Sequence, residues 1–98
     1  MTIPINVKVT ATTLAAATVA EIIPRNITRQ YLMIQNTGGT NPASFGFDNT
    51  VLAGTGVSLD PASAINGQGG SYEWVATVPT NPVFGFSTGG TTVIVIEG

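Results

Sequence analysis

The apolar run from Tyr31 to Ile34 places the strongest constraint on what this chain can fold into. Side chains alternate between the two faces of an extended strand, so Tyr31 and Met33 share one face. Leu32 and Ile34 share the other face. Both faces are apolar, as expected for a central strand that is covered on two sides rather than one that lies over water. Polar residues and two glycines end the run, and we interpret the segment as the central strand of a small β domain.

The length of the chain sets the number of domains that we expect. Ninety-eight residues predict a single domain, residues 1–98, with a core of modest size. There is no cysteine, which excludes a disulfide framework and a thiolate metal site. No basic region precedes an apolar run at the N-terminus, so we expect no signal peptide. The apolar runs fall short of the roughly 20 residues of a membrane helix, and we expect no membrane partner.

The chain carries unusually little charge. Only 8% of its residues are charged, against about 25% in an ordinary globular domain. The formal net charge of −2 leaves no basic stripe that would neutralise a phosphate backbone, so we expect no nucleic-acid partner. Two interpretations of the low charge stay open. Either Thr, Asn, Ser and Gly form a surface that water solvates, or neighbouring subunits cover much of the surface.

Residues 2–11 alternate between apolar and polar side chains, the pattern of a half-buried strand. The apolar positions on one side are Ile3, Ile5, Val7, Val9 and Ala11. Pro4 has no N–H to donate, which favours an edge strand or an arm, residues 1–11, that contacts a neighbour. Lys8 on the opposite side would protect such an edge against unwanted pairing.

Residues 12–23 allow two interpretations. Their alanines favour a helix, whereas Thr18, Val19 and the two isoleucines favour a strand, and Pro24 stops either element. We predict a loop followed by a strand over residues 18–23.

The tripeptide Phe-Gly-Phe occurs twice, at residues 45–47 and 84–86, each time soon after Thr-Asn-Pro. The two rings of one copy share a face, and the glycine lies opposite them. We predict two pseudo-equivalent hairpins in facing sheets, which place paired rings in one core while the glycine admits a close neighbour. A coincidence of composition is the alternative.

The second half of the chain is predicted to form short strands between turns. Residues 50–70 predict a loop with one brief strand, and residues 71–75 predict a strand in which Tyr72 and Trp74 share a face. Residues 91–97 are apolar on both faces and need cover from the sheet or from a partner. The complete pattern predicts an all-β fold, a small antiparallel sandwich or barrel with six to eight short strands.

The residue types that catalysis needs are largely missing. Without histidine, the usual general base and the commonest metal ligand are absent, and no Ser-His or Cys-His pair exists. Asp48, Asp60 and Glu73 show none of the spacing of paired catalytic carboxylates. We therefore predict no enzyme activity, no cofactor, no metal and no small-molecule substrate. Tyr72 with Trp74 would suit a sugar face, although a core or interface pair is the more common role of such residues.

Four segments together resemble a known class of proteins: Arg29–Asn36, Phe45–Phe47, Gly69–Trp74 and Thr91–Glu97. In this order they are similar to small β-structured virion proteins of tailed bacteriophages, of the capsid decoration (cement) type. The resemblance covers roughly residues 18–98. It implies a jelly-roll-like sandwich without catalysis, made in the host cytoplasm and located in the virion. It also implies binding to the major capsid protein on the outside of the head, with copies often joined as trimers.

Apolar residues in excess of one small core are the expected contacts with partners. The predicted interface residues are Ile3, Ile5, Val7, Val9, Tyr31, Met33, Tyr72 and Trp74. Two other functions stay open. The chain is a tail, connector or head-fibre attachment component, or it is a carbohydrate-binding host-adhesion module that uses Tyr72 and Trp74.

Overall fold

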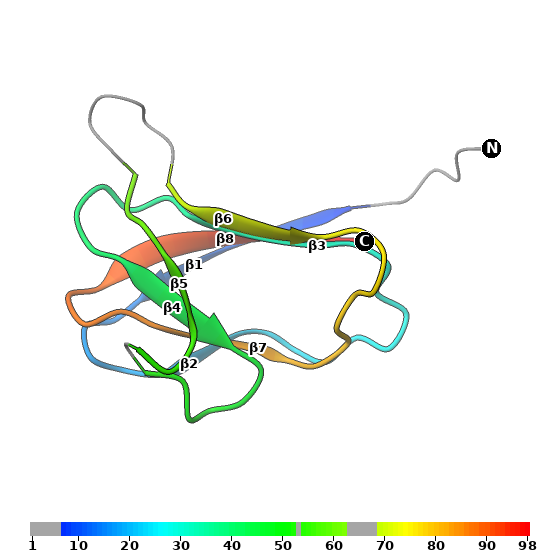
Figure 1. Cartoon of the computed structure of the whole chain (residues 1–98), viewed down its shortest axis with the longest axis horizontal. Helices are drawn as coiled ribbons and strands as arrows, with labels where there is room; N and C mark the ends of the chain where they lie inside the picture. Colours follow the sequence, from blue (N-terminus) through cyan, green and yellow to red (C-terminus); the bar gives the residue numbers. More distant parts are fainter. Residues whose placement is uncertain (1–6, 53, 63–68) are drawn as a thin grey trace.

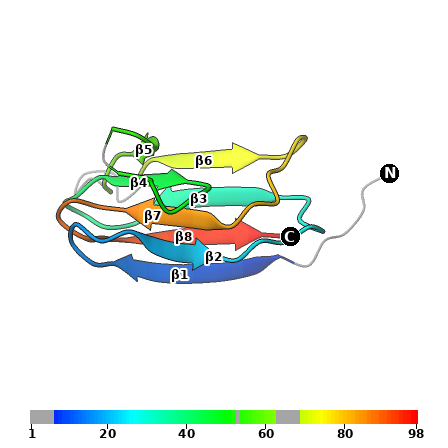
Figure 2. The same ribbon diagram turned by 90° about the horizontal axis from the view of Figure 1, so that it is seen from below.

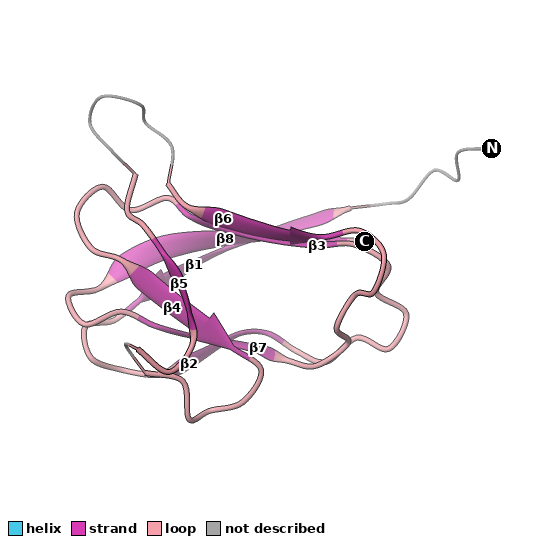
Figure 3. Ribbon diagram, in the orientation of Figure 1, coloured by secondary structure: helices cyan, strands magenta, loops and turns pink. Residues whose placement is uncertain are grey.

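The structure, a computed structural model, describes residues 7–52, 54–62 and 69–98. Within these ranges the chain forms eight strands and no helix (Figure 3). The strands are β1 Lys8–Leu14, β2 Ala20–Ile23, β3 Leu32–Asn36, β4 Ala43–Gly46, β5 Val57–Leu59, β6 Ser71–Trp74, β7 Val83–Phe86 and β8 Thr91–Glu97.

The strands form two four-stranded sheets that pack face to face (Figures 1 and 2). One sheet has the order β1-β8-β3-β6 and the other the order β2-β7-β4-β5. Each strand of the first half pairs antiparallel with its counterpart in the second half: β1 with β8, β2 with β7, β3 with β6, and β4 with β5. This nested pairing is a long hairpin rolled into two sheets, which is a jelly roll. The predicted all-β, jelly-roll-like antiparallel sandwich is confirmed.

The core lies between the two sheets, and β3 and β8 supply its centre. On β3, Leu32 and Ile34 are buried, and Val93 and Val95 of β8 lie beside them. The remaining members of the core come from β1, β2, β4, β5 and β7: Leu14, Ile22, Ile23, Ala43, Phe45, Leu59 and Val83. The predicted central strand is confirmed as β3, Leu32–Asn36, which begins one residue after Tyr31. The predicted cover on both of its sides is wrong, because Tyr31 and Met33 are only half-buried.

The first two strands differ from the prediction at their junction. β1 continues to Leu14, where we predicted a loop from residue 12, because it pairs with β8 along its whole length. The chain turns at Ala17, which has a φ of 54° and donates its N–H to the carbonyl of Ser87. β2 then occupies residues 20–23, so the strand interpretation of this region is confirmed and the helix alternative is wrong.

The two Phe-Gly-Phe copies are neighbours in one sheet rather than parts of facing sheets. β4 pairs with β7 so that Phe45 lies opposite Gly85, and Gly46 lies opposite Phe84. Gly85 faces the core, where a Cβ would come within 2.7 Å of Ile22 Cδ1. Phe84 therefore points away from the core, and the prediction of four rings in one core is wrong.

The copies nevertheless use glycine as expected, because each glycine faces a ring of the other strand. Phe45 enters the core, where its ring meets Phe47 and Trp74 edge-on with centroids 6.3 and 5.7 Å away. On the other side of the sheet, Val51 folds over Gly46. One tripeptide therefore sends its rings into the main core, whereas Phe84 and Phe86 of the other are not part of the buried core cluster.

Truncation of Phe45 and of Phe84 should lower the free energy of unfolding by different amounts. Phe45→Ala should lower the free energy of unfolding by about 3–5 kcal/mol, because it removes a buried ring and leaves a cavity. Phe84→Ala should cost clearly less, because this side chain is half-buried and lies outside the core. Urea unfolding of both variants measures the difference. Equal losses would contradict the assignment of the two rings to opposite faces of the sheet.

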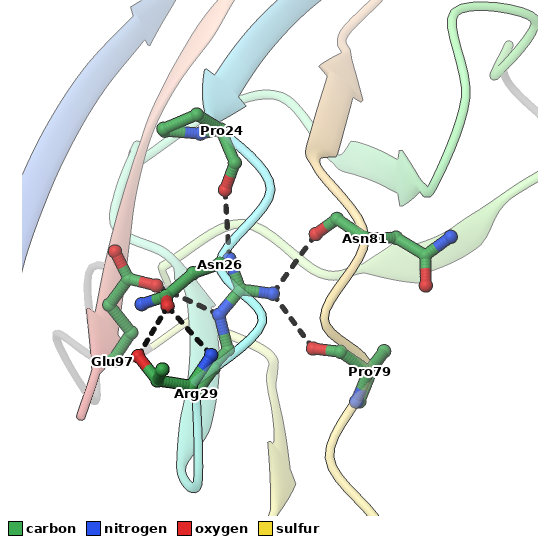
Figure 4. Close-up of polar contacts among 7 residues, drawn as sticks. Pro24, Asn26, Arg29, Pro79, Asn81 and Glu97 are labelled. Atoms are coloured by element: carbon green, nitrogen blue, oxygen red, sulfur yellow. Dashed lines mark hydrogen bonds and ion pairs between the residues drawn. The ribbon is translucent and has the colours of Figure 1, made fainter.

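A buried arginine holds one end of the sandwich (Figure 4). The side chain of Arg29 has no exposed surface, and its Nε donates to Glu97 Oε2 at 2.8 Å. One terminal nitrogen donates to the carbonyls of Pro79 and Asn81, and the other donates to the carbonyl of Pro24. The guanidinium thus joins the segments that follow β2 and precede β7 to the end of β8.

A buried asparagine holds the opposite end. Asn36, the last residue of β3, is fully buried. Its amide nitrogen donates to the carbonyls of Asn41 and Leu59, and its side-chain oxygen accepts from the N–H of Gly38 and the hydroxyl of Thr91. Every polar atom of this side chain therefore has a partner, and β3 is fixed at both of its ends.

Loss of the Arg29 side chain should destabilise the fold strongly. Arg29→Met leaves the Glu97 carboxylate buried without its partner, which typically costs about 3–5 kcal/mol. The double variant Arg29→Met with Glu97→Met should recover part of this loss, because it removes the unpaired charge as well. Denaturant unfolding of the single and double variants provides the comparison. A double variant less stable than Arg29→Met alone would refute this explanation.

Candidate functional site

The largest uncovered feature is the side of the β1-β8-β3-β6 sheet that faces away from the core. Strand register places its side chains in two rows across the sheet. One row is Val9, Ile96, Met33 and Glu73, and the other is Ala11, Ile94, Gln35 and Ser71. We call these eight residues the outer face. Six of them come from β1, β8 and β3, each of which also sends side chains into the core.

The part of the outer face on β1, β8 and β3 is mainly apolar and open to solvent. Val9 is 60% exposed, and Ile94, Ile96 and Met33 are each partly exposed, because no segment of the described chain packs over them. Their inward neighbours, by contrast, are buried in strict alternation along β8. An aliphatic band across adjacent strands is a candidate surface for contact with another molecule.

Glu73 is the single charged residue of the outer face, and it already has a partner. The hydroxyl of Tyr31 donates to Glu73 Oε2 at 2.5 Å. This hydrogen bond, together with slight burial and the negative charge of Glu73, raises the pKa of the Tyr31 phenol above its usual value. The pair gives the apolar band a polar border at β6.

Tyr72 and Trp74 lie on the other side of β6. They face inward opposite Ile34 and Leu32, and their ring centroids are 4.6 Å apart. Trp74 meets the edges of Phe45 and Phe47, so most of its ring surface is used within the subunit. Tyr72 is 46% exposed at the open side of the sandwich.

The structure therefore divides the predicted interface residues. Val9, Met33 and Tyr31 come together on or beside the outer face, and Val7, which precedes β1, is also exposed. Tyr72 and Trp74 belong to a separate aromatic cluster at the opening between the sheets. Ile3 and Ile5 lie outside the described residues.

In β1 the apolar side of the strand faces outward, whereas an ordinary half-buried strand turns its apolar side toward the core of its own subunit. Val9 and Ala11 point outward, whereas Thr10, Thr12 and Leu14 point inward. Leu14 enters the core at the end of the strand and so determines which side chains of β1 point inward. The predicted half-buried strand is thus present, but its apolar side is the exposed one.

Ile94 and Ile96 were not among the predicted interface residues, although they form the middle of the outer face. The signal was present in the sequence, because residues 91–97 are apolar on both faces and one face needed cover from elsewhere. A sandwich covers only one side of each sheet. The second side of β8 is therefore left open.

The described ranges contain no pocket and no group of acidic residues that would hold a metal ion. Among the residues that the structure describes there is no helix long and apolar enough to cross a membrane. None of the protein-family models, curated proteins or solved structures compared with this chain matches it.

The Tyr31–Glu73 pair predicts a measurable pH dependence. Because the folded state raises the pKa of Tyr31, the stability from this bond is present below the unfolded pKa and is lost as pH rises through the folded one. In a Tyr72→Phe background, the ultraviolet absorbance of phenolate reports Tyr31 alone. Adding Glu73→Ala should move its midpoint down toward the usual value. An unchanged midpoint would contradict the role of Glu73.

Proposed function

We propose that this chain is a structural virion protein, a capsid decoration protein that binds the outside of a bacteriophage head through its outer face and stabilises the shell. The observation that carries the proposal is the aliphatic band over β1, β8 and β3, with Val9 60% exposed. Its binding partners would be the major capsid protein and other copies of the same chain.

The shape and chemistry of the outer face suit a partner with a broad surface. The band crosses adjacent strands, and its one carboxylate already accepts a hydrogen bond from Tyr31. A partner would therefore gain mainly from excluding water over aliphatic side chains, at about 25 cal/mol per Å² of apolar surface. Recognition of a charged ligand has no basis on such a face, whereas packing against a protein lattice has.

The jelly roll supports the proposal by analogy. This architecture recurs in viral capsid proteins and in lectins, so the fold is compatible with a virion role and also with sugar binding. The sequence resemblance to decoration proteins favours the virion role. A second candidate, the host-adhesion module, has one observation in its favour, which is the exposed ring of Tyr72. Its neighbour Trp74 packs against Phe45 and Phe47, which leaves little of a stacking platform.

Location in the particle tests the proposed function directly. Particles of the phage whose genome encodes this chain should carry many copies over the whole head, as seen by electron cryomicroscopy and by quantitative mass spectrometry. A few copies at one vertex would instead indicate the tail, connector or head-fibre component. Complete absence from purified particles would refute both virion roles, and binding to a glycan array would then support the adhesion module.

A charge on the outer face should abolish shell binding. We expect Ile94→Lys and Ile96→Lys to lose binding to heads that lack this protein, because a lysine would be buried against an apolar partner. Leu52→Lys is the matched control, since Leu52 is 49% exposed on the connection between β4 and β5. Sedimentation of heads with added protein measures binding, and circular dichroism confirms folding. Retained binding by both isoleucine variants would exclude the outer face as the contact.

A further inference from the structure

We infer that two copies of this chain associate edge to edge through β1, antiparallel and centred on Ala11, so that their outer sheets form one continuous eight-stranded sheet. The inference concerns the isolated protein and does not require the virion role. To the proposed contact with other copies of the chain it adds the strand that forms the contact, its symmetry and its register.

β1 is the least protected edge of the sandwich. It lies at the border of its sheet, paired with β8 on one side only (Figure 2). Its seven residues contain no proline and no irregularity in pairing. The other three edges are shorter: β2 and β6 have four residues and β5 has three, and β2 also carries a bulge. A long edge with few charges presents free N–H and C=O groups to another strand.

Charge and length together select the register. Only an antiparallel pair centred on Ala11 uses all seven residues, and it places Lys8 of each copy opposite Leu14 of the other. The two lysines then lie about 20 Å apart at 3.3 Å per residue, more than twice the Debye length at physiological salt. Any shift toward the start of the strand brings them closer and shortens the overlap.

The same register keeps the apolar side continuous. In it, Val9 faces Thr13 of the second copy, and Ala11 faces its own equivalent, so all outward side chains stay on one side. One outer face measures about 19 by 17 Å, roughly 300 Å² in projection, from strand spacing and rise. A stable contact needs about 800 Å² per partner. Two outer faces side by side double this area to roughly 600 Å², which comes closer to that value than one copy does.

Val7, the residue before β1, favours a second copy over an unrelated strand. It is 54% exposed and continues the apolar side formed by Val9 and Ala11. In the proposed register Val7 lies opposite residue 15 of the second copy, where residues 15–18 are exposed. A foreign peptide would gain only the backbone bonds, whereas a second copy also brings this valine to that surface.

The contact has two-fold symmetry and joins two copies only. Once β1 of one copy pairs with β1 of the other, neither β1 is free to bind a third copy, and both subunits use the same surface. The sequence resemblance implies trimers, so the mass of the isolated protein distinguishes the proposed dimer from a trimer. We expect a dimer by light scattering after size exclusion at high protein concentration. A strict monomer or a trimer would overturn the inference.

Single cysteines test the register, because the natural chain has none. Ala11→Cys places two thiols directly opposite each other, where cross-strand Cβ atoms are about 4.5–5.5 Å apart, and mild oxidation should convert most of the protein to a covalent dimer. Ala76→Cys, at an exposed alanine after β6, is the matched control and should stay monomeric on denaturing gels. Equal cross-linking of both variants would overturn the inference.

A mixed experiment fixes the register further. Val9→Cys and Thr13→Cys should each cross-link poorly alone and efficiently when mixed, because each residue faces the other across the two-fold axis. Preferred self-linking of Val9→Cys would refute the register. Hydrogen exchange of the natural chain adds a test without any substitution. In a dimer the amides of β1 that point away from β8 are protected, and rapid exchange of these amides at high concentration would refute the pairing.

Discussion

The burial of the Arg29 guanidinium against Glu97 is the interaction on which the rest of the architecture depends. A buried cation must find its partners within the protein, and Arg29 finds one carboxylate and three backbone carbonyls. These acceptors belong to different segments, so their bonds fix the connections around β3 and the end of β8. Asn36 does the same at the other end of β3. With both ends fixed, only one set of side chains on each strand can enter the core.

The positions of the strands follow from the sequence far better than these polar contacts do. β3 and β8 are runs of apolar residues with a period that suits extended chains, and turn residues bound them on both sides. Arg29 and Glu97 are 68 residues apart, and the other acceptors of Arg29 are backbone carbonyls. Any residue type offers a carbonyl, so no pattern of letters identifies these partners before the fold is known.

Alternation identifies a strand without identifying the side that meets the core. In β1 the valine and alanine side is exposed, and the threonine side turns inward, because Leu14 enters the core in the same phase as the threonines. The Phe-Gly-Phe copies differ for a related reason. Antiparallel pairing sets a ring of one strand opposite the glycine of the other, which sends Phe45 inward and Phe84 outward. Both outcomes depend on register, a property of strand pairs rather than of one segment.

The open apolar face follows from the topology and cannot be removed by a small repacking of side chains. A jelly roll of this size has two layers, so each sheet packs one side on the other sheet and leaves its second side to solvent or to a partner. β8 is apolar on both sides and lies between β1 and β3, where a turn about its own axis would only exchange one aliphatic row for another. Three features therefore point the same way: the uncovered aliphatic row, the edge at β1 with its single charge, and the low charge of the whole chain. Each leaves apolar or uncharged surface without cover in one copy. In the proposed virion role, contact with other molecules would complete the burial of this apolar surface.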